Sequence, residues 1–150
     1  MKKLLALFFG VTFFSANFAV AAEMGTANEA VALVKKATAR VKQVGKEKAI
    51  AEFNDSKGPF IDRDLYIFVV DMEGKTLANG SNQKVVGKNV IEMKDADGNL
   101  FIKHFIEIAQ SKGSGWSDYK WVDPVTKGIR PKTTYVEKVD DIVVGCGIYK

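Results

Sequence analysis

Residues that build cross-links and metal centres are scarce in this chain of 150 residues, which has one cysteine, Cys146, and one histidine, His104. A single cysteine cannot form an internal disulfide, and one Cys with one His cannot supply the ligands of a zinc cluster. The sequence also lacks the C-x-x-C-H, G-x-x-x-x-G-K-[ST] and G-x-S-x-G motifs of haem attachment, phosphate loops and nucleophile elbows. We therefore expect no cofactor, no metal site and no enzymatic activity. A small secreted hydrolase, the opposing view, would have only His104 to build on.

An excess of charge of one sign is also missing. The chain has 22 Lys and Arg against 18 Asp and Glu, a formal net charge of +4. Removal of Lys2 and Lys3 with a leader would lower this to +2, because 4 minus 2 is 2. The charges are spread along the sequence, which is unlike the clustered basic surface of a nucleic-acid-binding protein. We expect no nucleic acid among its partners.

Long apolar runs are confined to the N-terminus. Lys2 and Lys3 precede a mostly apolar stretch at residues 4–20, and the small residues Ala21 and Ala22 follow it. This order is typical of a secretory signal peptide. An uncleaved anchor helix is the alternative, since the run is nearly long enough to cross a bilayer.

The pattern of a signal peptide at the N-terminus predicts how the chain is divided and where the protein is located. We predict a signal peptide at residues 1–22, cleaved after Ala21 or Ala22, and one domain at residues 23–150. No later stretch is long and apolar enough to span a membrane. The expected product is periplasmic or secreted, with no membrane span after cleavage.

Two helices are predicted to open the domain. Thr26 or Asn28 can cap a helix that runs to Val44, and Gly45 then ends or bends it. A shorter helix is expected at residues 46–55. The first helix is amphipathic, because apolar residues recur every three or four positions, at Ala30, Val31, Leu33, Val34, Ala37, Val41 and Val44.

The remaining pattern predicts an antiparallel sheet interrupted by a helical connection. A central strand at residues 65–70 turns and returns at 76–78, and residues 81–99 read as loop with a short helical piece near 90–93. A helix at 99–112 is followed by three strands at 116–122, 132–139 and 142–149. We predict an α+β fold whose sheet has the long first helix on one face and the helical connection on the other.

Four segments in this order carry a family resemblance: DLYIFVVDMEGKTLANG, VVGKNV, DADGNLFIKHFIEIAQSKGSGWSDYKWVDP and PKTTYVEKVDDIVVGCGIYK. Together they resemble the single, short Cache domain, a PAS-like extracytoplasmic sensor domain, over about residues 28–150. The resemblance implies binding of small organic molecules, often short carboxylates, for signalling or chemotaxis. In receptors a membrane helix and a signalling module follow the domain. Here the chain ends at Lys150, so we expect a stand-alone protein that hands on its ligand or reports to another protein.

The candidate site is the aromatic stretch GWSDYKW and its surroundings. Tyr119 and Trp121 share one face of their strand, while Trp116 lies on the other. Apolar walls with a few placed polar groups suit a small organic anion, and Lys132 can supply the charge. Tyr135 lies three residues after Lys132 in the same predicted strand, so the two side chains lie on the same face only if a bulge intervenes. The predicted ligand-binding residues are Tyr66, Phe68, Trp116, Tyr119, Trp121, Lys132 and Tyr135.

Plainer interpretations exist for each of these features. The aromatics can be ordinary core residues, and Lys132 can be a solvated edge charge. Cys146 lies in an apolar run and is expected to be buried. The DADGN turn starting at Asp95 lacks the calcium-loop Gly and Glu, so we interpret it as a turn that caps the following helix. As a whole, the domain can instead be an interaction module that docks through its first helix onto a membrane sensor or a second copy.

Overall fold

The first helix, α1 (Ala27–Val44), begins at a capping box. The backbone N–H of Glu29 donates to the Thr26 hydroxyl at 3.3 Å, and the Thr26 N–H donates to the Glu29 carboxylate at 2.8 Å. The helix ends at Gly45, whose φ of 87° favours glycine, and α2 (Lys46–Phe53) follows directly. Both predicted helices are confirmed, with Thr26 as the cap.

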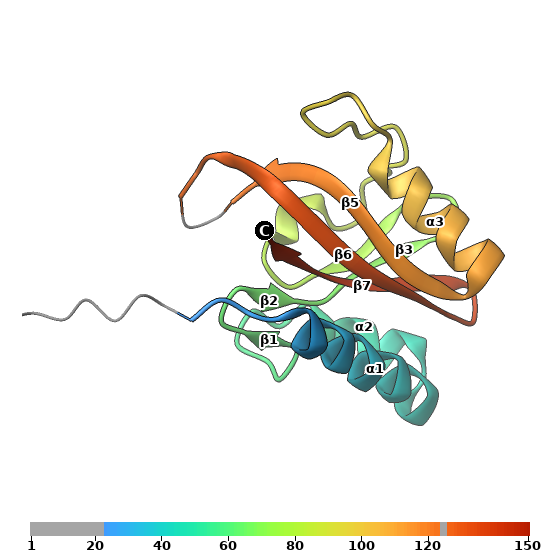
Figure 1. The fold of residues 1–150 in the computed structure, drawn as a ribbon. Helices are drawn as coiled ribbons and strands as arrows, with labels where there is room; N and C mark the ends of the chain where they lie inside the picture. The colour runs from blue at the N-terminus through green and yellow to red at the C-terminus, as the bar shows by residue number, and fades with distance from the viewer. Residues whose placement is uncertain (1–22, 124–125) are drawn as a thin grey trace, which may run out of the picture.

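This computed structural model describes residues 23–123 and 126–150, so the expected leader at 1–22 lies outside the described residues. The remaining elements follow in chain order (Figure 1). They are β1 (Ile61–Asp62), β2 (Leu65–Tyr66), β3 (Phe68–Asp71), β4 (Thr76–Asn79), the 3-10 helix η1 (Gln83–Val85), α3 (Phe101–Lys112), β5 (Ser114–Val122), β6 (Ile129–Val139) and β7 (Ile142–Tyr149).

Five of the strands form one antiparallel sheet in the order β4-β3-β7-β6-β5. The last strand of the chain, β7, therefore lies in the middle, between β3 and β6. The short strands β1 and β2 pair separately. Figure 1 shows α1 and α2 on one side of this sheet and α3 on the other, and α1 contacts β6 and β7 while α3 contacts β5 and β6. The predicted α+β architecture is confirmed.

Two local predictions were wrong. The continuous strand expected at 65–70 divides at Ile67, whose N–H donates to the Phe60 carbonyl and whose carbonyl accepts from Gly80. The split occurs because β2 pairs with β1, which the sequence did not reveal, while β3 pairs with β4 and β7. The short helical piece expected near 90–93 lies instead at Gln83–Val85, where the Asn82 side chain accepts from the Lys84 N–H.

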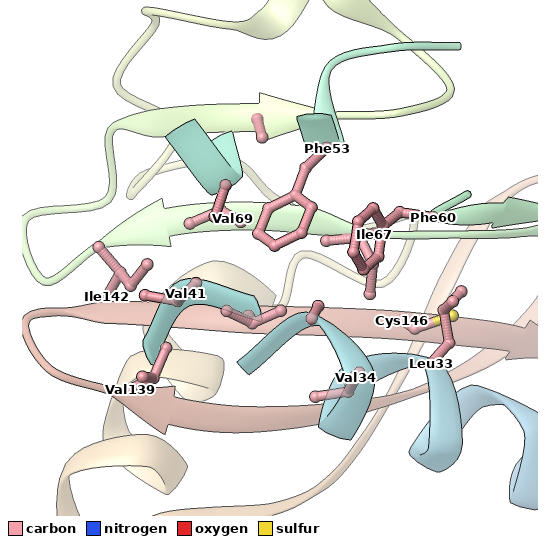
Figure 2. Close-up of a cluster of buried hydrophobic side chains, with 14 of the residues drawn as sticks. Leu33, Val34, Val41, Phe53, Phe60, Ile67, Val69, Val139, Ile142 and Cys146 are labelled. Carbon is pink, nitrogen blue, oxygen red and sulfur yellow. The ribbon is translucent and has the colours of Figure 1, made fainter. Parts of the chain in front are cut away.

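Residues of β7 alternate between the two faces. The side that packs on α1 carries Ile142, Val144 and Cys146, in a cluster of aliphatic and aromatic side chains (Figure 2). The opposite side carries Val143, Gly145 and Gly147 beneath the elements that pack with α3. Cys146 is fully buried, as expected from its apolar surroundings.

Candidate functional site

A cavity of about 110 Å³ lies on the α3 side of the sheet. Its walls come from β2, β3 and β5, from α3 and from the segment that runs from β4 toward α3. Three kinds of side chain line it. The aromatic ones are Tyr66, Phe68, Phe101, Phe105, Tyr119 and Trp121; the aliphatic and thioether ones are Val70, Val85, Val90, Met93 and Ile102; the polar ones are Thr76, Asn79, Ser81 and Asn82.

The aromatic wall is held by ring contacts between α3 and β5. Phe101 stacks on Tyr119 with ring centroids 4.6 Å apart and planes 2° from parallel, and Phe101 also contacts Trp121 at 5.0 Å. The Tyr119 hydroxyl lies 3.0 Å from the Thr134 Oγ1, inside the protein. Burial raises the pKa of Tyr119 to about 12, so its phenol is neutral at physiological pH.

Lys132 lies directly behind this wall and is 3% exposed. Its Nζ donates to the Tyr66 hydroxyl at 3.1 Å and to the Tyr149 hydroxyl at 3.5 Å. The same nitrogen lies 4.9 Å from the centre of the Tyr66 ring and 4.6 Å from that of Tyr149. Lys132 does not itself line the cavity, but it donates a hydrogen bond to Tyr66, which does.

The ammonium of Lys132 is charged, and no carboxylate in the described part of the chain forms a salt bridge with it. Burial lowers the pKa of Lys132, but the oxygens of Tyr66, Tyr119 and Tyr149 together outweigh burial and hold the pKa above its ordinary value. Among the salt bridges of residues 23–123 and 126–150, none involves Lys132. The site therefore holds a buried positive charge surrounded by phenols.

The predicted site residues separate into two groups. Tyr66, Phe68, Tyr119 and Trp121 line the cavity, and Lys132 contacts one of them. Trp116 and Tyr135 lie on the opposite face of the sheet, where their rings contact each other with centroids 5.5 Å apart.

Several lining and supporting residues were not anticipated. Tyr149 pairs directly with Lys132 across β6 and β7, a register that follows from the tight turn between Val139 and Ile142. Counting outward from that turn would have found it. The polar wall of Thr76, Asn79, Ser81 and Asn82 had no such signal, because it lies in a segment that reads as ordinary loop.

Two other polar features do not form part of the cavity. The Nδ1 of His104 lies 2.8 Å from the Oγ of Ser117, but Ser117 is 2% exposed, which leaves its hydroxyl little access to a substrate. The Asp95 carboxylate accepts from the N–H groups of Asp97, Asn99 and Lys120. It thus forms a turn and ties that turn to β5, whereas the predicted cap on the following helix is wrong, since α3 begins after Leu100 with no side-chain cap.

Comparison with known families identifies the domain. A family model described as single Cache domain 2 matches residues 19–150. The chain belongs to the single Cache domain 2 family. Two curated relatives match parts of the chain. They are the sensor histidine kinase MctS of Rhizobium johnstonii, 34% identical over 89 residues, and the methyl-accepting chemotaxis protein McpP of Pseudomonas putida, 24% identical over 90 residues.

The matched stretches make up 58% and 59% of this chain but only 19% of the kinase and 16% of the chemotaxis protein, so the Cache domain corresponds to a minor part of each receptor. Within residues 23–123 and 126–150, no helix is long and apolar enough to cross a membrane. The same described stretches contain no group of three or more His, Cys, Asp or Glu residues that could hold a metal ion.

Solved structures share the fold. A Cache chemosensory domain described for carboxylic acid recognition superposes with a TM-score of 0.69 at 20% identity, over 81% of this chain and 91% of that chain. A methyl-accepting chemotaxis protein from Vibrio parahaemolyticus has a TM-score of 0.63 at 26% identity, over 81% and 86%. A periplasmic sensor domain of a chemotaxis protein has a TM-score of 0.64 at 24% identity, over 81% and 88%. These three sensor domains share the fold of this Cache domain.

Proposed function

We propose that this Cache domain is an exported sensor-type domain that binds a short organic monocarboxylate in the cavity beside Tyr66. The observation that carries the proposal is the charged ammonium of Lys132, which is buried next to the cavity residue Tyr66 and has no salt bridge to any carboxylate that the structure describes. A buried charge is costly unless an opposite charge or hydrogen bonds compensate for it. An anion in the cavity supplies the missing opposite charge.

The route from the ammonium to the ligand passes through a phenol. The Tyr66 oxygen accepts a hydrogen bond from Lys132, which leaves the Tyr66 O–H free to donate toward the cavity that this residue lines. A carboxylate oxygen in the cavity accepts that hydrogen bond. Hydrogen bonds to charged groups are the stronger kind, and the ammonium one atom behind reinforces this one electrostatically.

Size and lining favour a small ligand with one charge and an apolar end. The volume of about 110 Å³ is smaller than the ~150 Å³ cavity that accommodates benzene, so the ligand has fewer heavy atoms than that ring. Lysine, arginine and histidine are absent from the lining residues, so a second carboxylate would have no cation of its own. The related Cache chemosensory domain described for carboxylic acid recognition is consistent with this chemistry.

Calorimetric titration of the purified protein with acetate, propionate and succinate tests the proposal. Lys132→Met keeps the apolar length of the side chain but removes its charge, and we expect it to weaken propionate binding by about 10- to 150-fold, equivalent to about 1.5–3 kcal/mol. Lys138→Met, an exposed lysine on the same strand, is the matched control and should bind like the wild type. Equal affinity of Lys132→Met and the wild type, or a preference for succinate, would overturn the proposal.

The remaining parts of the proposal concern location, partners and chemistry. Residues 1–22 act as a cleaved signal peptide, which places the domain in the periplasm or outside the cell, where the family's sensor domains work. The domain reports ligand binding to a membrane receptor or a second copy and performs no catalysis. Mass spectrometry of the exported protein tests cleavage, since a mass that retains residues 1–22 contradicts it. A chromogenic ester panel tests catalysis, and turnover lost in His104→Ala would contradict a pure binding role.

A further inference from the structure

Two glycines of β7, Gly145 and Gly147, lie on the cavity side of the most central strand. Neither has a positive φ, so the backbone conformation would accept any residue at either position. Glycine in a strand interior weakens the strand and often marks a place where another group approaches closely. The space above each glycine explains its presence here.

Above Gly147 lies the side chain of Lys132. A Cβ atom at position 147 would be 2.6 Å from the Lys132 Cε and 2.3 Å from the Thr134 Oγ1, closer than such atoms can approach. The lysine therefore crosses β7 at this glycine to bring its Nζ to Tyr66 and Tyr149. Any side chain at position 147 would move the ammonium.

Above Gly145 lies the ring of Phe68. A Cβ atom at position 145 would be 2.3 Å from the Phe68 Cζ and 2.7 Å from its Cε1. Phe68 lines the cavity and contacts Phe105 with ring centroids 5.6 Å apart. A side chain at position 145 would displace this ring, since the three atoms nearest to the added Cβ all belong to Phe68.

We propose that these two glycines divide the specificity of the site between charge and shape. Gly147 is the positioning residue for Lys132 and sets the preference for an anion over a neutral molecule. Gly145 is the positioning residue for Phe68 and sets how large a ligand fits. This inference rests on the proposed binding of carboxylates in the cavity.

The test compares propionate with propionamide, which has nearly the same shape but no charge. The wild type should bind propionate at least about 10-fold more tightly than propionamide. Gly147→Ala should bring this ratio to within about 2-fold of one, because the ammonium no longer reaches Tyr66. Gly145→Ala should weaken both ligands and leave the ratio unchanged. Gly128→Ala is the matched control, since among the described residues its added Cβ would meet only the Thr126 Oγ1, at 3.7 Å.

Two results would overturn the division of roles. One is a Gly147→Ala variant that keeps the wild-type ratio of propionate to propionamide affinity. The other is a Gly145→Ala variant whose ratio falls as far as that of Gly147→Ala. If Gly147→Ala does not fold, Gly147→Ala/Thr134→Ala takes its place with Thr134→Ala as reference, because removal of the threonine relieves the tighter contact while the contact with Lys132 remains.

A measurement without ligand separates this inference from the proposed function. Gly147→Ala should lower the midpoint of thermal unfolding more in the wild type than in a Lys132→Ala/Thr134→Ala background, where the two tightest contacts are gone and the Thr133 carbonyl at 3.3 Å remains. If propionate fails to bind the wild type, the proposed function fails, yet this difference still supports the positioning of Lys132. An equal loss in both backgrounds would show that Gly147 does not make room for these side chains.

Discussion

The two faces of the central sheet are packed in different ways. On one face α1 contributes fully buried small residues such as Ala30 and Ala37 to a cluster of aliphatic and aromatic side chains, part of which Figure 2 shows. On the other face α3 presents Phe101 and Phe105 to Tyr119 and Phe68, and a cavity of about 110 Å³ remains. Small residues let a helix approach closely, whereas large planar rings keep it further from the sheet. The same sheet is therefore packed closely on one face and borders a cavity, the candidate binding site, on the other.

The two faces also differ in their buried charge. The α1 face surrounds Cys146 with apolar side chains, and burial raises the pKa of this thiol to about 12. The opposite face contains the charged Lys132, the phenols of Tyr66 and Tyr149 and the hydroxyl of Thr134. The α1 face has a buried polar group too, but the Thr38 hydroxyl is satisfied within the protein because it donates to the Glu137 carboxylate at 3.1 Å.

The largest expected effect comes from opening a cavity on the closed face. Phe53 is fully buried and meets Phe60 edge to face at 4.6 Å. We expect Phe53→Ala to lower the free energy of unfolding by about 3–5 kcal/mol, measured by urea denaturation. Phe105→Ala should cost less, because its ring already borders an open space. Equal losses for the two variants would contradict the contrast between the faces.

A smaller effect is expected from adding a hydroxyl to the closed face. Cys146→Ser places a polar oxygen among aliphatic side chains and should lower the free energy of unfolding by about 1–3 kcal/mol. Cys146→Ala removes the sulfur without adding a polar group and is the control for lost packing. Both are measured by urea denaturation, and a serine variant at least as stable as the alanine variant would show that this face tolerates polarity.

The fold was largely predictable because its signals are periodic and local. The capping box at Thr26, the apolar stripe of α1 and the tight turn before Ile142 are each visible within a few residues. The break at Ile67 was not, because it depends on pairing with β1, whose two residues carry no strand pattern. The positions of strands followed from sequence, while their partners depended on contacts distant in the chain.

The site was predictable only in part, for a similar reason. Strand alternation placed Tyr119 and Trp121 together, and the family resemblance drew attention to Lys132. Alternation also put Trp116 and Tyr135 on the other face, where the structure has them. The loop residues of the cavity, such as Ser81 and Asn82, could not be found, because nothing local distinguishes a loop that borders a cavity from one that faces water.

Removing a hydroxyl from the cavity face is expected to have a modest effect. Thr134→Val keeps the shape of the side chain but leaves the buried Tyr119 hydroxyl without its partner at 3.0 Å. The free energy of unfolding should fall by about 1 kcal/mol, measured by urea denaturation. In the double variant Thr134→Val/Tyr119→Phe both partners are gone, so we expect most of the loss to be recovered. A double variant less stable than Thr134→Val would contradict a pairwise role for this hydrogen bond.

The smallest expected effect concerns the start of α1, where charged side chains rather than apolar packing hold the first turn of the helix. Glu29 accepts from the Thr26 N–H and forms a salt bridge with Arg63 at 2.7 Å, which joins the helix to the turn between β1 and β2. The Thr26 N–H, more than any other group, and then the Arg63 guanidinium lower the pKa of Glu29 to about 2.

Because this folded-state pKa lies below the unfolded value of about 4.3, ionised Glu29 stabilises the folded state above pH ~4. That contribution is lost as the pH falls from ~4 to about 2. Urea denaturation at several pH values should therefore show Glu29→Gln less stable than the wild type at pH 6, with the difference shrinking toward pH 2. Glu92→Gln, an exposed glutamate, should show no such pH dependence. If the difference in free energy of unfolding between Glu29→Gln and the wild type stayed constant from pH 6 to pH 2, the shape rather than the charge of the Glu29 side chain would stabilise the start of α1.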